Sequence, residues 1–253
     1  MDKDSTSRVA WVTGAGKGIG RAVARQLALE GWIVGASART SRDLTTLELE
    51  CLPGTVKSMP LDVTDTLATA RVIATIEEEL GELDLVILNA GTHLPISVEN
   101  FSVDIFRTLI ETNLMGTVNG LAEIIPRFTA RGCGHIAIVA SLAAYRGLPT
   151  AAAYGATKVG LIHMCEALKP ELQKYGISLT LINPGFVETP LTAKNKFQMP
   201  FLITSETAAK HIVRGLEKQS FEITFPWQLA AIMRVLRFLP NSLLFAITQR
   251  MLK

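Results

Sequence analysis

The stretch RVAWVTGAGKGIGRAVARQLAL, residues 8–29, decides the fold of this chain. It opens with a short apolar run that contains valine and tryptophan, which predicts a buried strand. The pattern from Ala22 to Leu29 is helical, with its apolar residues on one side. A strand, a glycine-rich turn and a helix in this order present the free N–H groups of a helix N-terminus to a phosphate.

The glycine turn has the spacing T-G-x-x-x-G-x-G, with Gly14, Gly18 and Gly20 as its glycines. It does not follow the G-x-G-x-x-G pattern, because Ile19 stands where the last glycine of that pattern is expected. Glycines let the backbone approach a pyrophosphate without a Cβ atom in between. Placed between a strand and a helix, the turn predicts a dinucleotide site.

The residues after the second predicted strand, 32–37, indicate which dinucleotide binds. Folds that use NAD usually place a carboxylate there, where it binds the ribose 2′-hydroxyl group. This chain has Ala38 followed by Arg39, and Lys17 adds a second cation in the glycine turn. Because a guanidinium binds a 2′-phosphate well, the sequence predicts NADP(H). The alternative is that both cations are simply solvated.

Strand and helix patterns alternate along the chain. Strands are predicted at 8–13, 32–37, 56–61, 83–88, 134–140, 177–182 and 221–225. Helices are predicted at 22–29, 67–80, 101–131 and 151–175, the third interrupted by Gly116 and Gly120. This alternation predicts an α/β fold, a Rossmann-like doubly wound parallel sheet of about seven strands with helices on both faces. We expect one catalytic domain over residues 1–225 and an amphipathic helical extension over 226–253.

The composition argues against several other classes of protein. With 253 residues, 48% hydrophobic and 19% charged, the chain is expected to be globular, and its net charge of +2 indicates no nucleic-acid partner. Cys51, Cys133 and Cys165 are scattered and the four histidines are isolated, so we expect reduced thiols and no metal site. Reduced thiols suit a cytoplasmic location, with membrane association left open. We also expect no signal peptide or transmembrane helix.

Tyr154 and Lys158 lie four residues apart on a predicted helix, so their side chains point the same way. A free phenol has a pKa near ~10, and a neighbouring ammonium group lowers that pKa. Such a pair is suited to move a proton to or from an alcohol or carbonyl oxygen. Taken alone, the spacing is common by chance and favours a buried tyrosine and a solvated lysine on an ordinary helix.

Residues suited to ligand binding follow four of the predicted strands. They are Asp62-Val63, Asn89-Ala90-Gly91, Ser141 and Pro184-Gly185. Ligands of a doubly wound sheet bind at the carboxyl ends of its strands, so these residues are expected to gather around one site.

Together these residues resemble the short-chain dehydrogenase/reductase family in its compact form of ~250 residues. The resemblance covers about residues 8–220. Its motifs are Thr13-Gly14-x-x-x-Gly18-x-Gly20, Asp62, Asn89-Ala90-Gly91, Asn113, Ser141, Tyr154-x-x-x-Lys158 and Pro184-Gly185 with Thr189.

The resemblance implies a catalytic set of four residues. Tyr154 is the general acid in reduction and the base in oxidation, and Lys158 lowers the Tyr154 pKa and holds the nicotinamide ribose. Ser141 hydrogen-bonds the carbonyl oxygen and stabilises the charge that develops there. Asn113 holds a water molecule that links Lys158 to solvent.

The resemblance also implies a set of cofactor-binding residues. Asp62 and Val63 line the adenine, residues 89–91 flank the adenosine ribose, and Thr189 with the backbone near Val187 holds the carboxamide. The full set is Gly14, Lys17, Gly18, Ile19, Gly20, Arg39, Asp62, Val63, Asn89, Ala90, Gly91, Tyr154, Lys158, Pro184, Gly185, Val187 and Thr189.

The predicted function is therefore hydride transfer between NADPH and a carbonyl or secondary-alcohol substrate. The substrate is expected to be lipophilic, because the covering loop at 190–203 is apolar at its far end and Leu142, Leu148 and Phe186 are expected to face the cleft. The alternative is that Met199, Phe201 and Leu202 of this loop serve only as a hinge and in packing. Two alternatives use the same fold: a non-catalytic NADP(H)-binding sensor, and a membrane-surface protein.

The end of the chain departs from the family. Pro226-Trp227 follows the last predicted strand, where many relatives have a Thr-Gly-x-x-x-x-x-Asp-Gly-Gly segment that serves tetramer contacts. We therefore favour a dimer through the helices at 104–131 and 151–175.

A basic segment, 226–253, replaces the missing motif, with a net charge of +4 and no acid. In its first predicted helix, Leu229, Ile232, Leu236 and Leu239 share one face and Arg234 and Arg237 lie on the other. The segment packs on the body or a second subunit, lies on an anionic membrane, or covers the substrate cleft as a lid; the sequence leaves these alternatives open.

Overall fold

The computed structural model describes residues 8–194 and 198–251. Within this part of the chain, seven strands form one sheet in the order β3-β2-β1-β4-β5-β6-β7, with every pairing parallel. The strand order reverses between β1 and β4, as in a doubly wound fold. This confirms the predicted fold class. The strands are β1 (Val9–Thr13), β2 (Ile33–Ser37), β3 (Val56–Ser58), β4 (Leu83–Leu88), β5 (Gly134–Val139), β6 (Ile177–Pro184) and β7 (Glu222–Phe225).

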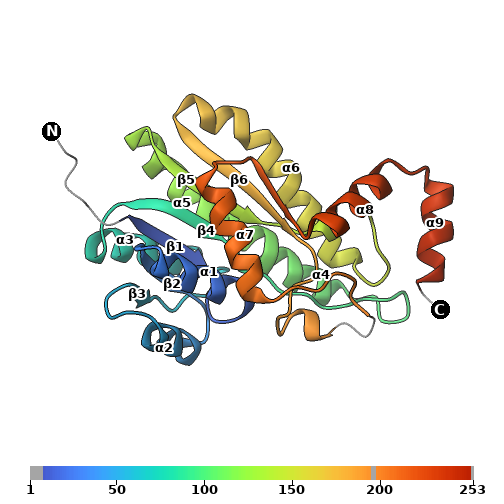
Figure 1. Ribbon diagram of the computed structural model, residues 1–253, viewed down its shortest axis with the longest axis horizontal. Helices are drawn as coiled ribbons and strands as arrows, with labels where there is room; N and C mark the ends of the chain where they lie inside the picture. The colour runs from blue at the N-terminus through green and yellow to red at the C-terminus, as the bar shows by residue number, and fades with distance from the viewer. Residues whose placement is uncertain (1–7, 195–197, 252–253) are drawn as a thin grey trace.

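Helices cover both faces of the sheet (Figure 1). Helices α1, α2 and α7 pack on one face, and α3, α5 and α6 pack on the other. The α-helices are α1 (Gly18–Leu29), α2 (Ser41–Glu50), α3 (Thr66–Glu79), α4 (Val103–Leu109), α5 (Gly116–Arg131), α6 (Ala152–Lys174), α7 (Ser205–Glu217), α8 (Trp227–Phe238) and α9 (Asn241–Arg250). Short helical segments are the π-helix η1 (Ile110–Met115) and the 3-10 helices η2 (Leu142–Ala144) and η3 (Thr192–Lys194).

Alternate residues of strand β1 pack into the hydrophobic cores on the two faces of the sheet. Ala10 and Val12 face the core beneath α1 and α7, whereas Val9 and Trp11 face the core beneath α3, α5 and α6. Successive side chains of a strand point to opposite faces of the sheet. A central strand covered on both sides must therefore be apolar throughout, and all five residues of β1 are buried.

Several boundaries differ from the predicted ones. Strand β3 ends at Ser58, and Pro60, which has no N–H to donate, interrupts the predicted continuation to residue 61. Strand β6 runs on to Pro184, because its last residues pair with β7. Helix α2 was not predicted, since only Leu44 and Leu47 of its ten residues are buried and its apolar signal is weak.

The two glycines expected to break the long helical stretch do not do so. The irregular part is the π-helix η1, and α5 then begins at Gly116 and continues through Gly120. A Cβ atom at Gly116 would lie 2.6 Å from Val63 Cγ2, and one at Gly120 would lie 2.7 Å from Leu88 Cδ2. These glycines therefore allow α5 to pack closely against the loop after β3 and against strand β4. Helix α6 also runs as one element through Pro170.

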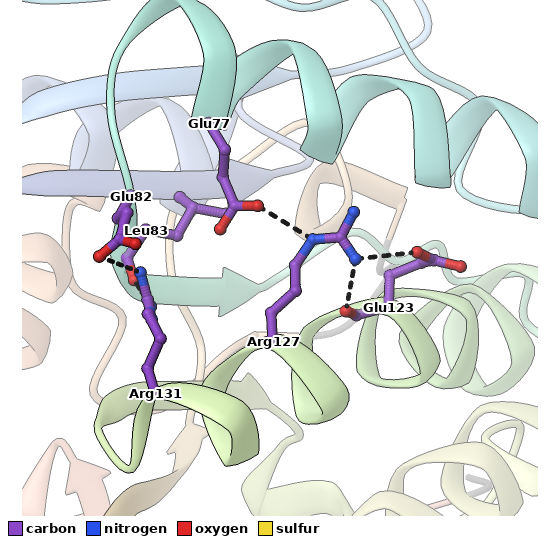
Figure 2. Close-up of polar contacts among 6 residues, drawn as sticks. All are labelled: Glu77, Glu82, Leu83, Glu123, Arg127 and Arg131. Atoms are coloured by element: carbon purple, nitrogen blue, oxygen red, sulfur yellow. Dashed lines mark hydrogen bonds and ion pairs between the residues drawn. The ribbon is translucent and has the colours of Figure 1, made fainter.

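Two arginines of α5 fasten this helix to its neighbours (Figure 2). Arg127 Nε donates to Glu77 Oε2 of α3 at 3.0 Å, and its other nitrogen contacts the Glu123 carboxylate at 3.4 Å. Arg131 donates to the carbonyl oxygen of Leu83 and pairs with Glu82 at 3.3 Å. The contacts of Arg127 are partly buried and join α3 to α5, and those of Arg131 join α5 to the start of β4.

Helix α8 packs on the body with most of the predicted face: Leu229 is buried and Leu236 is half-buried against the core, as expected, but Ile232 is not. Leu229, Ala230 and Met233 are buried in the core, whereas Ile232 is 46% exposed. Arg234 was expected to point away from the body, but it pairs with Glu222 at 3.5 Å, and Arg237 lies over the Tyr145 ring at 5.9 Å. The division of the chain at residue 225 stays a prediction.

The stability of the sheet is expected to fall in mild acid through His135 of β5. Burial, followed by the charge of Lys169, lowers the pKa of His135 to about 4. Between about pH 6.5 and pH 4 the unfolded chain takes up a proton that the folded chain does not, so lowering the pH through this window destabilises the fold. The His135 contribution to the unfolding free energy should fall by about 2 kcal/mol between pH 7 and pH 4.5.

Urea unfolding of the wild type and of His135→Gln at both pH values measures this contribution. Other groups titrate in the same range, so the difference between the two proteins is the relevant quantity. An equal loss of stability in both proteins would contradict the assignment to His135.

Candidate active site

Thr13, at the carboxyl end of β1, joins β1 to the end of β4. Its Oγ1 accepts the backbone N–H groups of Asn89 and Ala90 at 2.9 and 3.0 Å. Asn89 Nδ2 donates in return to the Thr13 carbonyl oxygen at 2.9 Å and to that of Gly14 at 3.3 Å. The glycine turn and the Asn89-Ala90-Gly91 motif are thus brought together at the point where the strand order reverses.

The glycines of the turn stand where a side chain does not fit. A Cβ at Gly20 would lie 2.4 Å from both Asn89 Nδ2 and Gly14 O, and a Cβ at Gly18 would lie 2.8 Å from Thr189 Cγ2. Gly14 and Gly18 also have positive φ angles, of 67° and 56°. The contact between Gly18 and Thr189 brings together two predicted cofactor residues that are far apart in the sequence.

Helix α1 begins inside this turn, at Gly18. Its N-cap residue, Lys17, makes no capping hydrogen bond with its side chain among the described residues. The first N–H groups of α1 therefore remain available to a phosphate. Ile19 is half-buried and packs against the core on the α1 face of the sheet.

A cavity of about 420 Å³ lies at the ends of β2 and β3. Asp62 is exposed at its edge and accepts from Thr64 N and Thr64 Oγ1 at 3.0 and 2.8 Å. Val63 is buried, and its carbonyl oxygen accepts from Asn119 Nδ2 at 2.9 Å. The residues that line the cavity are Arg39, Pro60, Leu61, Asp62, Asp65 and Ala68.

Asp43 is a carboxylate near the glycine turn that sequence reasoning missed. It follows the position of the expected acid by five residues, in the unpredicted helix α2. Its Oδ2 lies 3.3 Å from Lys17 Nζ, so part of the Lys17 charge is already balanced. Arg39 is exposed and forms no ion pair within the described residues.

Ser141, Tyr154 and Lys158 come from β5, whose end precedes Ser141, and from α6. Ser141 Oγ accepts the N–H of Ala143 at 3.1 Å, so the hydroxyl proton of Ser141 is free to donate toward Tyr154. Lys158 Nζ donates to the carbonyl oxygen of Val139 at 2.8 Å and lies 5.8 Å from the centre of the Tyr154 ring. Lys158 is only 4% exposed.

The electrostatics of this trio differ from the prediction. Burial raises the pKa of Tyr154, and the hydrogen bond from Ser141 acts in the opposite direction. Burial lowers the pKa of Lys158 to about 8. The expected lowering of the Tyr154 pKa by Lys158 is therefore not found, because removal from water disfavours both charged forms.

Asn113 is fully buried in the π-helix η1. Its Oδ1 accepts from Thr92 N at 2.7 Å, and its Nδ2 donates to Thr92 O and Thr157 Oγ1 at 2.9 and 3.1 Å. Both amide hydrogens are thus engaged, and the side chain holds the loop after β4 against α6. A Cβ on Gly91 would lie 3.3 Å from Asn113 Oδ1 and 3.5 Å from Lys158 Nζ. The bridging water stays a prediction.

The predicted nicotinamide end lies after β6. Gly185 N donates to Phe225 O at 2.7 Å, and a Cβ at Gly185 would lie 2.6 Å from Leu229 Cδ2 of α8. Val187 is buried, and Thr192 Oγ1 donates to its carbonyl oxygen at 2.6 Å. Thr192 also bonds Thr189, so the turn that carries Thr189 is held in place.

His93, one of the four histidines that are isolated in the sequence, lies next to Tyr154. It is 9% exposed, and the two rings meet edge to face with centroids 4.8 Å apart. Burial and then the charge of Lys194 lower the pKa of His93. Leu142, expected to face the cleft, is instead 1% exposed within the core. Residues 195–197 of the covering loop lie outside the described residues.

The candidate site residues gather at the carboxyl edge of the sheet. Over residues 8–199 it matches the family described as short chain dehydrogenase. The chain belongs to this family. The match confirms the resemblance drawn from the motifs, and the chain is an oxidoreductase of the short-chain dehydrogenase type.

Relatives of this short-chain dehydrogenase agree with that assignment. A protein of Myxococcus xanthus named "Uncharacterized oxidoreductase" is 39% identical over 246 residues, covering 96% of this chain and 97% of the relative. The crystal structure of a short-chain dehydrogenase from Streptomyces avermitilis superposes with a TM-score of 0.82 at 25% identity, covering 91% of this chain and 92% of the other.

A further solved structure adds information on fold alone, because it is 22% identical. It is a short-chain dehydrogenase/reductase from Burkholderia phymatum in complex with NAD, with a TM-score of 0.81 over 90% of this chain and 92% of the other. Within the described residues of the present dehydrogenase, no group of three histidine, cysteine or acidic side chains is arranged to hold a metal ion.

Gly20→Ala tests the cradle formed by the glycine turn. A Cβ atom at residue 20 would lie too close to the backbone of Gly14, which cannot shift without disturbing the turn. We therefore expect the substitution to lower the free energy of unfolding by about 1–3 kcal/mol. Dinucleotide affinity should fall by at least about tenfold. Gly147→Ala is the matched control, because no described atom lies within 4 Å of its Cβ. Urea unfolding and fluorescence titration with NADPH measure both effects; equal behaviour of the two variants contradicts the assignment.

Proposed function

We propose that this oxidoreductase is an NADPH-dependent carbonyl reductase that can also run in reverse as an alcohol dehydrogenase. The observation that carries the proposal is the meeting of Ser141, Tyr154 and Lys158 next to the Asn89-Ala90-Gly91 loop, which itself contacts the glycine turn. The bound nicotinamide supplies or accepts the hydride, and the residues of this chain position the substrate and move the proton.

Each member of the trio has a separate role in this proposal. Tyr154 donates its proton to the carbonyl oxygen in reduction, and its raised pKa keeps the phenol protonated for that step. Ser141 donates a hydrogen bond to the same oxygen as negative charge develops there. Lys158 uses one of its three N–H donors on Val139, which leaves two for the ribose hydroxyls.

The NADPH preference rests on charge at the end of β2. No carboxylate occupies position 38 to repel a 2′-phosphate, and Arg39 is an exposed cation at the edge of the adjoining cavity. Asp43 works against the preference, because it balances Lys17 and adds negative charge beside the turn. Arg39 is therefore the residue on which the preference depends most.

The test of this preference is a set of dissociation constants measured by fluorescence. NADPH should bind about ten- to hundredfold more tightly than NADH, since a charge-assisted contact is worth ~1.5–3 kcal/mol. Arg39→Ala should remove most of that difference, and Asp43→Asn should increase it by freeing Lys17. Arg71→Ala removes an exposed cation on α3 and serves as the control. Equal affinities of the wild type for NADPH and NADH contradict the proposal.

The substrate class in this proposal is a lipophilic carbonyl compound. Leu148 and Phe186 are half-buried beside the core that includes Leu142, and Phe201 and Leu202 of the covering loop are each 43% exposed.

We also propose a dimer through the helices at 104–131 and 151–175. Apolar Ile110, Met115 and Val159 are exposed there without a covering element among the described residues.

Tyr154→Phe tests the chemistry while keeping the aromatic ring. The rate of single-turnover hydride transfer with saturating NADPH should fall about 10²–10⁴-fold, with NADPH affinity little changed. Ser141→Ala should lower turnover without loss of NADPH affinity, and Lys158→Ala should lower both. Tyr175→Phe makes the same change at a 53% exposed position and should be silent. Near wild-type turnover in Tyr154→Phe would falsify the assignment and favour a non-catalytic binding protein.

The pH dependence offers a second readout in the same experiment. Lys158 is charged below a pKa of about 8 and neutral above it. The rate of reduction should therefore be steady below about pH 8 and decline above it. In the reverse direction Tyr154 must be deprotonated, so oxidation should rise with pH. A reduction rate that increases above pH 8 contradicts these roles.

A further inference from the structure

Helices α8 and α9 expose apolar side chains, α8 on the side opposite its buried residues and α9 around most of its circumference, with Leu244 as its buried residue. On α8, Trp227, Val235 and Phe238 share one stripe, opposite the buried Leu229 and Met233. Trp227 is 74% exposed and Phe238 is 84% exposed. We call the exposed apolar residues of both helices the tail face: Trp227, Ile232, Val235, Phe238, Leu243, Phe245, Ile247 and Met251.

The tail face lies on a segment that has positive charge only. Residues 226–253 contain three arginines and one lysine and no acid, whereas the remainder of the chain has a net charge of −2. Arg234 borders the stripe, is 54% exposed and pairs with Glu222, and Arg250 is exposed at the end of α9. A surface that joins tryptophan, phenylalanine and leucine with arginine is complementary to anionic headgroups above an apolar layer.

The tail is attached firmly to the segment that follows Ser141. Arg146 donates to the carbonyl oxygen of Leu239 at 3.0 Å and to Asn241 Oδ1 at 2.6 Å, at the junction of α8 and α9. The neighbouring Tyr145 donates to the carboxylate of Glu222, the same group that pairs with Arg234. The tail is thereby held by hydrogen bonds to the segment that follows Ser141 and, through Glu222, to strand β7.

The tail also lies near the proposed active site. Helix α9 stands at the same end of the long axis as the loops after β4 and β6, which flank the site (Figure 1). The loop after β4 also exposes Val98 and Phe101, at 86% and 64%. The match to the Myxococcus relative leaves out only 4% of this chain, which is fewer residues than the tail at 226–253 contains. At least part of the tail is therefore aligned with that relative. No described helix is long and apolar enough to cross a bilayer.

We propose that the tail face docks on the surface of an anionic phospholipid bilayer. The apolar side chains enter the boundary between headgroups and acyl chains, and the arginines contact phosphate groups. The helices lie on the membrane without spanning it. In this orientation the catalytic end of the sheet lies near the bilayer, from which a lipophilic substrate can reach it; this last step alone rests on the proposed function.

Vesicle flotation with the full-length protein tests the docking. We expect the protein to float with vesicles of phosphatidylcholine and phosphatidylglycerol in equal parts. It should float much less with phosphatidylcholine alone, and salt should weaken the binding. Phe238→Glu and Ile247→Glu should each reduce binding by at least about tenfold, because a carboxylate is repelled by the headgroups and resists burial. Leu49→Glu, at an 80% exposed position of α2, is the matched control and should float like the wild type.

Trp227 supplies an independent signal. Trp11 is fully buried, and Trp227 is the highly exposed tryptophan of the tail, so binding to anionic vesicles should shift its emission to shorter wavelength. Trp227→Phe should abolish that shift while the protein still floats. Because all of these positions are exposed, melting temperature and NADPH affinity should stay at the wild-type values, which separates lost docking from lost folding.

Three outcomes overturn the proposal. Full-length protein that stays unbound with both kinds of vesicle has no membrane affinity. Flotation of Phe238→Glu and Ile247→Glu at wild-type levels places any membrane contact elsewhere. A change of Phe238→Glu from dimer to monomer, with flotation absent in both proteins, assigns the tail face to a subunit interface. None of these outcomes depends on NADPH binding or catalysis, so the docking can fail while the proposed reaction stands.

Discussion

The fold and the site both depend on the contact between Thr13 and Asn89 at the centre of the sheet. Strands β1 and β4 are distant in sequence, and the order of the sheet reverses between them. Two backbone N–H groups meet the Thr13 hydroxyl there, and the Asn89 amide returns to the glycine turn. These hydrogen bonds satisfy backbone groups that leave the sheet, and they leave no room for a side chain at Gly20. The glycine turn and the loop beside Lys158 are thus positioned by one shared contact.

Burial governs the protonation of the proposed catalytic trio, Ser141, Tyr154 and Lys158. Lys158 is nearly inaccessible and Tyr154 lies beneath His93, so removal from water disfavours both the ammonium and the phenolate. The protein alone therefore favours a neutral phenol and a lysine with a pKa of about 8. Without oxidised cofactor, the protonation states of these residues suit proton donation by Tyr154. The positive charge of a bound oxidised nicotinamide would shift Tyr154 toward the phenolate.

The basic C-terminal segment shows how one helix can serve two surfaces. The inner face of α8 completes the core next to Gly185, where Leu229 fills the space that a larger residue would need. The outer face is apolar as well, and the arginines lie at the borders between the two. A helix that is apolar on both sides has either two partners or one partner and an unusual solvent-exposed surface. This feature distinguishes the tail from the other helices on the sheet and led to the proposal of a lipid surface.

The sequence by itself determined the architecture, because buried parallel strands require continuous apolar runs and these alternate visibly with helical patterns. It also determined the residues at the strand ends, since Gly14, Asn89 and Ser141 fall at such ends through the chain order alone. Only the tertiary structure decided which charges meet. Asp43 pairs with Lys17 from a helix with too weak an apolar pattern to predict, and Arg237 turns inward over Tyr145. It also decided the direction of the Tyr154 pKa. Desolvation depends on what surrounds a group in three dimensions, and spacing along a helix does not contain that information.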